Sequence, residues 1–250
     1  MDKYYTKPAI AELCCKHFAQ TMKIDYEHDM IIEPSAGAGA FIRPIKLLCK
    51  NRLFIDIAPD HRYIKKGDFL DLDIDSKLYR NIYVIGNPPF GFKSSMAIKF
   101  IKKACEFCHA FGFILPKSFA KDSMTRSVPR NFHMRHQMVL PDDSFIGIKV
   151  PCVFQIWIKR KDLRKVPKKI EPIGYKFIDD PALADIAIRR VGSKAGHVYH
   201  TDLMKRNKNT HYFIKLYKKM DIKNITSRCI SDVIGPLSLS KQRIIKELNI

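Results

Sequence analysis

The sequence predicts an α/β fold in which a mostly parallel sheet ends in an antiparallel hairpin and is followed by a small basic extension. Three observations support this prediction. Short apolar runs that end at acidic or turn-forming residues alternate with segments of helical periodicity as far as residue 115, a pattern typical of βαβ units. The next two apolar runs have no helical segment between them. After residue 158 the chain becomes markedly more basic.

The helices and strands of the parallel part are predicted from local patterns. A first helix is expected over residues 7–22, with Thr6 as its N-cap and Pro8 in its first turn. For the other elements, short apolar runs are assigned to buried strands and helical periodicity to helices. They are strands at residues 30–32, 53–55, 82–85 and 111–115, and helices at residues 40–50 and 95–108.

The end of the sheet is predicted to be antiparallel. Apolar runs at residues 137–140 and 153–158 are separated by the polar turn Pro141-Asp142-Asp143 and by no helical segment. A parallel connection needs a longer crossover, usually a helix, whereas a loop suffices for an antiparallel pair. We therefore expect these two runs to form a hairpin that closes the sheet.

The charge of the chain predicts a polyanionic partner. Lys and Arg number 45 against 25 Asp and Glu, a formal net charge of +20. Residues 159–250 hold 22 of the basic and 9 of the acidic residues, a net charge of +13. Such an excess destabilises a compact chain by self-repulsion. Nucleic acid is the first candidate for the partner, and an anionic membrane surface is the second.

The sequence favours a protein that works inside the cell, in cytoplasm or nucleus, without a membrane anchor. No apolar run approaches the roughly 20 residues of a membrane-spanning helix, and the N-terminus has no apolar core of a secretory signal. The seven cysteines are odd in number and scattered, which indicates reduced thiols. Cys105 and Cys108 have the spacing of a zinc-ligand pair, but no second pair matches them, so we expect no metal and two cysteines on a buried helix face.

A glycine-containing turn predicts a cofactor site. The segment Glu33-Pro34-Ser35-Ala36-Gly37-Ala38-Gly39-Ala40-Phe41 follows the first strand, and a helix is expected directly after it. Glycines let the backbone turn sharply and approach a ligand closely beside a helix N-terminus. Asp56 ends the second strand, where a carboxylate can accept hydrogen bonds from two ribose hydroxyls. Alone, these features indicate a nucleoside cofactor, and NAD is possible, although the third glycine of the dinucleotide motif is missing.

The segment Asn87-Pro88-Pro89-Phe90 provides the second set of candidate residues. It follows a predicted parallel strand, at the sheet edge where open α/β proteins bind ligands. The Asn87 side-chain oxygen and the Pro88 carbonyl are adjacent acceptors that could bind both hydrogens of an amino group, such as N6 of adenine. The prolines fix the backbone between them, and Phe90 offers a ring for stacking on a displaced base.

Together these residues resemble the amino-methylating branch of the Rossmann-like, S-adenosylmethionine-dependent nucleic-acid methyltransferases. Tyr5-Thr6-Lys7-Pro8 resembles their N-terminal cofactor motif, Tyr-Thr-Pro, with Lys7 inserted. The segment 33–41 resembles their first cofactor motif, Asp56 their ribose-binding acid, and Gly67-Asp68-Phe69 their adenine-side motif. The segment 87–90 matches their catalytic Asn/Asp-Pro-Pro-Tyr/Phe motif. The resemblance covers about the first 160 residues.

The resemblance implies a class I methyltransferase fold with seven strands, of which residues 1–160 bind S-adenosylmethionine and carry out catalysis. Residues 161–250 would then form a basic extension for nucleic-acid recognition. The implied catalytic residues are Asn87, Pro88, Pro89 and Phe90, and the implied base-stacking rings are Phe90 and Phe145. The implied cofactor-binding residues are Tyr5, Thr6, Glu33, Pro34, Ser35, Gly37, Gly39, Phe41, Asp56, Ile57, Asp68, Phe69 and Asn87.

The basic extension contains candidate residues for binding nucleic acid. Arginines in a predicted strand precede a glycine-rich basic turn, an arrangement that suits phosphate contacts. Further basic residues are interleaved with aromatic ones, as in proteins that bind single strands, although the aromatic side chains can equally belong to a core. The candidates are Arg189, Arg190, Lys194, Lys205, Arg206 and Lys208.

Several functions remain open at this stage. Methylation of adenine N6 in DNA is slightly preferred to the same reaction on RNA. Methylation of a protein glutamine amide uses a similar motif, but the net charge of +20 disfavours it. A nucleic-acid-binding protein without catalysis would not need both motifs intact. The oligomeric state, the target sequence and any protein partner do not follow from the sequence.

Overall fold

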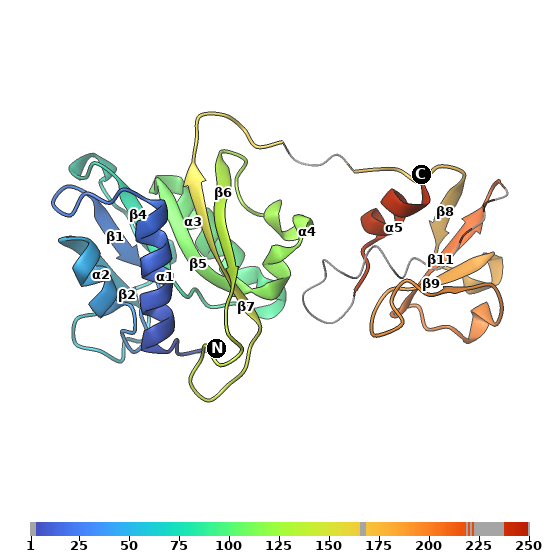
Figure 1. Ribbon diagram of the computed structural model, residues 1–250, viewed down its shortest axis with the longest axis horizontal. Coiled ribbons are helices and arrows are strands. Elements are labelled where there is room, and N and C mark those ends of the chain that lie inside the picture. The colour runs from blue at the N-terminus through green and yellow to red at the C-terminus, as the bar shows by residue number, and fades with distance from the viewer. Residues whose placement is uncertain (1–3, 166–168, 219, 221, 223–237, 250) are drawn as a thin grey trace. The chain divides into compact units, whose positions relative to one another are not determined.

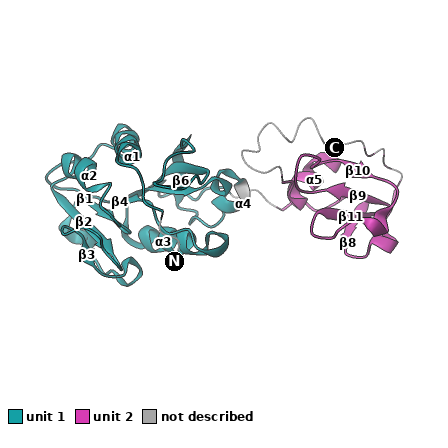
Figure 2. Ribbon diagram, turned by 90° about the horizontal axis from the view of Figure 1, so that it is seen from below, with its two compact units in different colours: residues 1–166 teal, residues 167–250 magenta. Residues whose placement is uncertain are grey.

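The computed structural model of the protein describes residues 4–165, 169–218, 220, 222 and 238–249. The chain divides into two compact units, Met1–Val166 and Pro167–Ile250, shown in Figures 1 and 2. The family resemblance predicts this boundary after residue 160. The difference arises from Arg164, whose guanidinium donates to the backbone carbonyls of Thr125, Val128 and Phe132 and stacks over the Trp157 ring. These contacts attach the segment before Val166 to unit 1.

Unit 1 contains a seven-stranded sheet in the order β3-β2-β1-β4-β5-β7-β6, which confirms the predicted fold class. The first five strands pair in parallel, and β7 pairs antiparallel with both β5 and β6. The strands are β1 Met30–Glu33, β2 Asn51–Asp56, β3 Lys65–Lys66, β4 Ile82–Gly86, β5 Ala110–Pro116, β6 Phe132–Val139 and β7 Cys152–Lys159.

Helices cover both faces of this sheet (Figure 1). The helices α1 Pro8–Thr21 and α2 Ile42–Leu48 pack on one face, and α3 Ser95–Phe107 packs on the other. The central strands β1 and β4 are covered on both sides and are buried along their whole length. The shorter helices are α4 Asp122–Thr125 and the 3-10 turns η1 Phe69–Asp71, η2 Ser76–Leu78, η3 Phe92–Ser94 and η4 Lys117–Ala120.

The first helix begins differently from the prediction. Its N-cap residue is Lys7, not Thr6, and no side chain caps the helix. Thr6 instead forms an isolated antiparallel bridge with Phe145 and is buried. Tertiary pairing with a distant loop has therefore replaced the local capping bond that a threonine ordinarily makes.

Two strands of the sheet differ from the prediction: β6 is longer than expected, and β3 was not expected. The strand β6 begins at Phe132, not at residue 137, and includes a bulge between Met134 and His136. As an edge strand it keeps polar residues such as Arg135 exposed, so its first half lacks an apolar pattern. The strand β3 consists of Lys65 and Lys66, both exposed, and carries no apolar signal at all.

Unit 2 is a four-stranded antiparallel sheet in the order β10-β9-β11-β8. Its strands are β8 Tyr175–Ile178, β9 Ile186–Arg189, β10 Val198–Tyr199 and β11 His211–Leu216, with 3-10 turns η5 Pro181–Leu183 and η6 Leu203–Lys205. The helix α5 Lys241–Leu248 contributes Ile244 and Ile245 to a core that also contains Ile188 and Ile214. The basic extension is thus a folded unit with its own apolar core.

The cysteine pair lies in the apolar core of unit 1. Cys105 is on the buried face of α3, and Cys108 follows the end of that helix. Burial raises the pKa of both thiols above the ordinary value of 9.0. Within the described residues, no group of three His, Cys, Asp or Glu side chains could hold a metal ion, and no helix is long and apolar enough to cross a membrane.

Close packing at Gly112 in β5 provides a test of the core. A Cβ atom added there would lie 2.6 Å from Phe18 Cδ2 of α1 and 2.9 Å from Phe154 Cζ of β7. Neither ring can move freely, because both are completely buried. The absence of a side chain at this position therefore allows α1 to approach the sheet.

Replacement of Gly112 by Ala should lower the free energy of unfolding by about 1–3 kcal/mol, as expected for overpacking. Gly67→Ala is the matched control, since its Cβ would meet only the flexible end of Ile55, at 3.0 Å. Urea titrations of both variants provide the comparison. Equal losses for the two variants would show that the packing at Gly112 is looser than described.

Candidate active site

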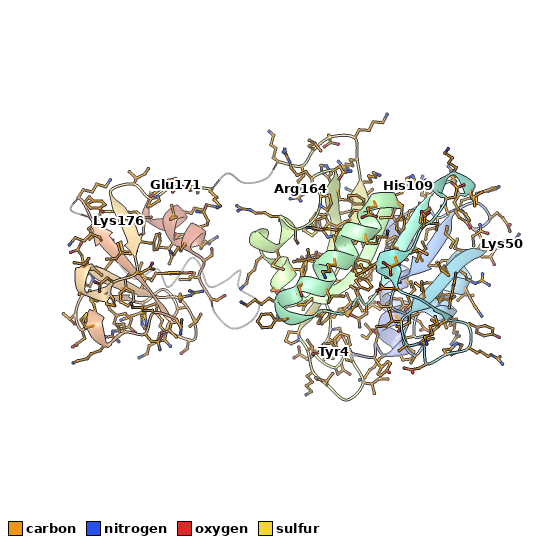
Figure 3. All side chains as sticks on the ribbon, turned by 180° about the vertical axis from the view of Figure 1, so that it is seen from behind. Tyr4, Lys50, His109, Arg164, Glu171 and Lys176 are labelled. Carbon is orange, nitrogen blue, oxygen red and sulfur yellow. The ribbon has the colours of Figure 1, made fainter. Side chains whose placement is uncertain are left out.

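Two adjoining hollows form a cleft at the ends of β1, β2 and β4. Both hollows are lined by Tyr4, Tyr5, Ser35, Gly37 and Asn87. Figure 3 shows Tyr4 at the opposite end of unit 1 from His109, the residue that directly precedes β5. The cleft therefore lies at the carboxyl ends of the parallel strands, where open α/β sheets bind ligands.

The turn after β1 has the backbone geometry of a ligand-binding loop. Gly37 and Gly39 have φ values of 50° and 86°, which side chains rarely tolerate. A Cβ at Gly39 would also lie 2.6 Å from Ile42 Cδ1, so a side chain at this position would require the Ile42 side chain to move. The Gly39 N–H donates to the Ala36 carbonyl at 2.7 Å, which closes the turn before α2.

Asp56 is held at the end of β2 by the same turn. Its Oδ2 accepts from the Gly37 N–H at 2.9 Å, and its Oδ1 accepts from the Ala58 N–H at 2.8 Å. A carboxylate has about four acceptor positions, so two remain for the hydroxyls of a ligand. Ile57 is 44% exposed and also lines the cleft, as does Asp68, whose Oδ1 caps η1.

Glu33 is a buried acid at the end of β1 and lines the second hollow. Its Oε2 has no hydrogen-bond partner among the described residues. Burial, reinforced by the negative charge of Asp56, raises the pKa of this carboxyl well above the ordinary value of 4.5. A positively charged ligand in the cleft would favour ionisation of Glu33 and would compensate its burial.

Asn87 directly follows β4 and is oriented by two hydrogen bonds. Its Nδ2 donates to the Tyr4 carbonyl at 2.9 Å, and its own carbonyl accepts from the Ser35 hydroxyl at 2.9 Å. The Oδ1 atom is buried and has no partner among the described residues. Buried polar atoms are nearly always paired, so this oxygen fits a ligand that donates a hydrogen bond.

The N-terminal segment joins the parts of the cleft. The Tyr5 ring lies 3.5 Å from the position of a Gly37 Cβ, and its hydroxyl donates to Asp60 Oδ2 at 2.6 Å. Thr6 pairs with Phe145 in the loop before β7, and the Ile146 N–H donates to the Tyr5 carbonyl at 2.9 Å. Residues far apart in the sequence are thereby held around one cleft.

The two rings predicted to stack on the target base lie close to a third aromatic ring. The Tyr4 ring centroid is 5.5 Å from that of Phe90 and 6.0 Å from that of Phe145. Phe90 and Phe145 are both buried, and neither lines the two hollows. The structure thus brings the predicted rings to one cluster, with Tyr4 covering them.

Most of the predicted cofactor-binding residues line the cleft, but Phe69 does not. Its ring is fully buried and packs 5.3 Å from the centroid of Phe100, which takes its place in the wall. The predicted residues found in the lining are Tyr5, Thr6, Glu33, Pro34, Ser35, Gly37, Gly39, Phe41, Asp56, Ile57, Asp68, Asn87, Pro88 and Pro89.

Tyr4, Met96 and Phe100 line the cleft but were not predicted. Met96 and Phe100 stand one helical turn apart at the start of α3, a spacing that any buried helix face shares. Tyr4 precedes the recognised motif by one residue, and its position next to Tyr5 was the only available signal.

The predicted nucleic-acid-binding residues all lie in unit 2, but their surroundings differ. The Arg190 guanidinium stacks over Tyr212 at 4.7 Å and that of Arg206 over Tyr199 at 3.8 Å. The guanidinium of Arg189 donates to the Val191 carbonyl and the Thr210 hydroxyl, and Lys205 pairs with Asp202. Lys194 and Lys208 are exposed. The three arginines therefore make contacts within unit 2, whereas the exposed side chains of Lys194 and Lys208 are better placed to bind another molecule.

Solved structures similar to this chain include several methyltransferases. One is a Pyrococcus horikoshii protein provisionally assigned as an RNA methyltransferase, with 17% identity, TM-score 0.49, and coverage of 64% of this chain and 87% of that one. The 23S rRNA methyltransferase ErmE shows 12% identity, TM-score 0.45, and coverage of 64% and 71%. The M protein of the type I restriction enzyme EcoKI shows 14% identity, TM-score 0.47, and coverage of 63% and 44%.

No protein-family model matches the sequence, and no curated protein sequence matches it significantly. The function of the site must therefore be inferred from its own residues.

The raised pKa of Glu33 gives a prediction on stability against pH. An acid whose pKa is raised by folding stabilises the protein fully below the unfolded value, near 4.5, and this contribution is lost as pH rises through the folded pKa. In the Glu33→Gln variant, the free energy of unfolding should therefore decrease less steeply as the pH rises above 4.5. It should also stabilise the ligand-free protein at neutral pH.

Glu12→Gln is the control, because Glu12 is an exposed acid of α1 whose oxygen lies 3.8 Å from Arg43. Denaturant titrations at a series of pH values compare both variants with the wild type. If the free energy of unfolding depends on pH in the same way in Glu33→Gln and the wild type, Glu33 ionises in the folded protein with little loss of stability.

Proposed function

We propose that this protein transfers a methyl group from S-adenosylmethionine to the exocyclic N6 amino group of adenine in nucleic acid. The observation that carries this proposal is the orientation of Asn87. Its amide nitrogen is committed to the Tyr4 carbonyl, so its buried oxygen is left as an acceptor without a partner among the described residues.

The acceptors fit an amino group attached to an aromatic ring. The lone pair of such a nitrogen is delocalised into the ring, which makes it a poor nucleophile. Asn87 Oδ1 and the Pro88 carbonyl can each accept one of its hydrogens and so favour a more tetrahedral nitrogen. If the amide of Asn87 were reversed, it would present hydrogens to the amino group, and the bond to Tyr4 prevents this reversal.

The cleft suits a cationic nucleoside cofactor better than a dinucleotide. Asp56 and Asp68 contribute carboxylates to its walls against the one guanidinium of Arg43, and the turn after β1 lacks the third glycine of the dinucleotide motif. S-adenosylmethionine has a sulfonium and an ammonium group, and its activated methyl group would supply the electrophile. In this arrangement Asp56 would bind the ribose hydroxyls, the turn containing Gly37 and Gly39 would approach the cofactor closely, and Ile57 would cover its adenine.

The charge distribution supports a polyanionic substrate. The net charge is +20, and 22 of the 45 basic residues belong to residues 159–250. Aromatic rings beside the acceptors suit an adenine displaced from a strand, at a cost of a few kcal/mol when the strand is a duplex. Unpaired adenines in single-stranded DNA or RNA would avoid this cost.

The direct test is transfer of labelled methyl from S-adenosylmethionine to matched pools of DNA and RNA, followed by separation of the product nucleosides by mass. N6-methyladenine in one pool establishes the reaction and the substrate together. If the protein binds the cofactor but labels no nucleoside, and labels a glutamine amide in a protein instead, the proposal is wrong.

Asn87→Ala should reduce turnover by on the order of 10²–10³-fold, the usual effect of removing one preorganised hydrogen-bonding group at a reacting centre. Affinity for S-adenosylmethionine, measured by calorimetry, should stay within a few-fold. Asn209→Ala, at an exposed turn of unit 2, is the control for substitution of an asparagine. A fully active Asn87→Ala enzyme would contradict the assigned role.

Binding to nucleic acid should weaken as salt is raised. Each neutralised phosphate contributes about −0.9 to the slope of log K against log salt for duplex DNA, and about −0.7 for single strands. Exchanging both Lys194 and Lys208 for Ala should make the slope shallower by about 1.4–1.8 units. Lys16→Ala combined with Lys23→Ala, in unit 1, is the matched control. If the two double variants change the slope equally, unit 2 is not the main contact surface.

A further inference from the structure

The segment directly after the catalytic motif presents an exposed aromatic ring. Phe92 is 80% exposed, the highest value among the exposed large hydrophobic side chains of the described residues. It follows Phe90 by two residues, so the two Cα atoms are at most about 7 Å apart. A ring at this position would lie about one or two nucleotides away from a base that stacks on the aromatic cluster of Tyr4, Phe90 and Phe145.

The backbone around Phe92 is held in an unfavourable conformation. Gly91, Lys93 and Ser94 have φ values of 67°, 50° and 63°, and the last two are not glycines. The Ser94 N–H donates to the Gly91 carbonyl at 3.1 Å, and the N–H groups of Met96 and Ala97 both donate to the Phe90 carbonyl. Strained residues that are fixed by surrounding bonds concentrate at functional sites. The segment thus holds Phe92 outward, instead of letting its ring pack onto the protein.

A second exposed apolar segment follows Phe145, the other ring that packs on Tyr4. Phe145 contacts the Tyr4 ring from the side of the β6–β7 loop, and the residues that follow include Ile146 and Ile148, which are 60% and 43% exposed. Ile146 also lines the cleft. Each of the two rings that pack on Tyr4 is therefore followed closely in the sequence by exposed apolar side chains, and the two sets belong to different loops.

Basic groups accompany these tips. The Lys93 Nζ lies 5.0 Å from the centroid of the Phe92 ring, and Lys149 is exposed next to Ile148. An apolar ring beside an ammonium group matches a nucleotide, which has a flat base and a phosphate. A purely apolar partner would offer the Lys93 ammonium group no counter-charge.

We propose that Phe92 stacks on the nucleobase next to the target adenine and so holds the strand while the adenine enters the cleft. This inference rests on the proposed function, because it assumes that the strand is a nucleic acid. The stacking partner is any base, since every base has a flat π face, so Phe92 adds affinity and position without reading sequence.

The test measures binding at equilibrium and needs no turnover. The probe is a short single strand of otherwise randomised sequence that contains one adenine followed by the fluorescent base 2-aminopurine. Stacking quenches this fluorophore, so the wild type should quench it on binding. Phe92→Ala should lose the quenching and weaken binding by about 5- to 140-fold, the range for removing one base–aromatic stack.

Two further variants make the result specific. Phe92→Tyr keeps the ring and should behave like the wild type. Leu47→Ala removes a side chain that is 75% exposed near the end of α2 and should change neither binding nor quenching. All variants should keep the wild-type affinity for S-adenosylmethionine, because Phe92 does not line the cleft.

The outcomes separate this inference from the proposed function. If adenine is methylated but Phe92→Ala binds and quenches like Leu47→Ala, the inference is wrong and the function stands. If no nucleoside is methylated but quenching depends on Phe92, the inference stands and the function is wrong. Phe92→Ala could instead weaken binding to a protein substrate and leave binding to the single-stranded probe unchanged. This result would overturn the inference and identify a protein partner.

Discussion

The hydrogen bond between the Asn87 amide and the Tyr4 carbonyl determines how the rest of the site can work. It has a length of 2.9 Å and connects the end of β4 with a segment 83 positions earlier in the chain. It fixes which end of the amide faces the ligand, and it places Tyr4 between Phe90 and Phe145. Because Tyr5 and Thr6 follow at once, the same segment also reaches the glycine turn and the loop before β7. One short stretch of backbone therefore aligns the glycine turn and the aromatic cluster of Tyr4, Phe90 and Phe145 around the cleft.

The balance of charge in the cleft differs from that of the chain as a whole. The chain as a whole is strongly basic, yet the walls of the cleft contain the three acids Glu33, Asp56 and Asp68 against one basic residue, Arg43. A nucleic acid would be attracted over long range by the lysines and arginines. Its phosphates would be repelled at the cleft, whereas a neutral base or a cationic cofactor would not. In the proposed function, this division would direct the base inward and keep the backbone of the strand at the surface.

Local patterns were sufficient to predict the parallel sheet and the glycine turn. β1 and β4 are short apolar runs that end at the site, and Gly37 and Gly39 are needed where the backbone has positive φ. Contacts between distant segments could not be predicted. Thr6 has the residue type of a helix cap but pairs with Phe145, and Phe69 matches a cofactor motif but lies under Phe100.

Unit 2 shows the same limit of local patterns. Its arginines have the composition of a phosphate-binding surface, but Arg190 and Arg206 stack on tyrosines of their own unit. Composition reports the number of cations in a segment, whereas their availability depends on which side chains the fold places beside them.

The bridge between Thr6 and Phe145 has a consequence for the order of folding. The cleft is complete only when residues separated by 139 positions have come together, and contacts of such sequence separation form slowly because a long loop must close first. During synthesis, the segment that begins at Tyr4 must wait until β5 and β6 have left the ribosome before it can settle. The binding site is therefore among the last parts of unit 1 to form, and any ligand that occupies it stabilises the finished unit rather than an intermediate.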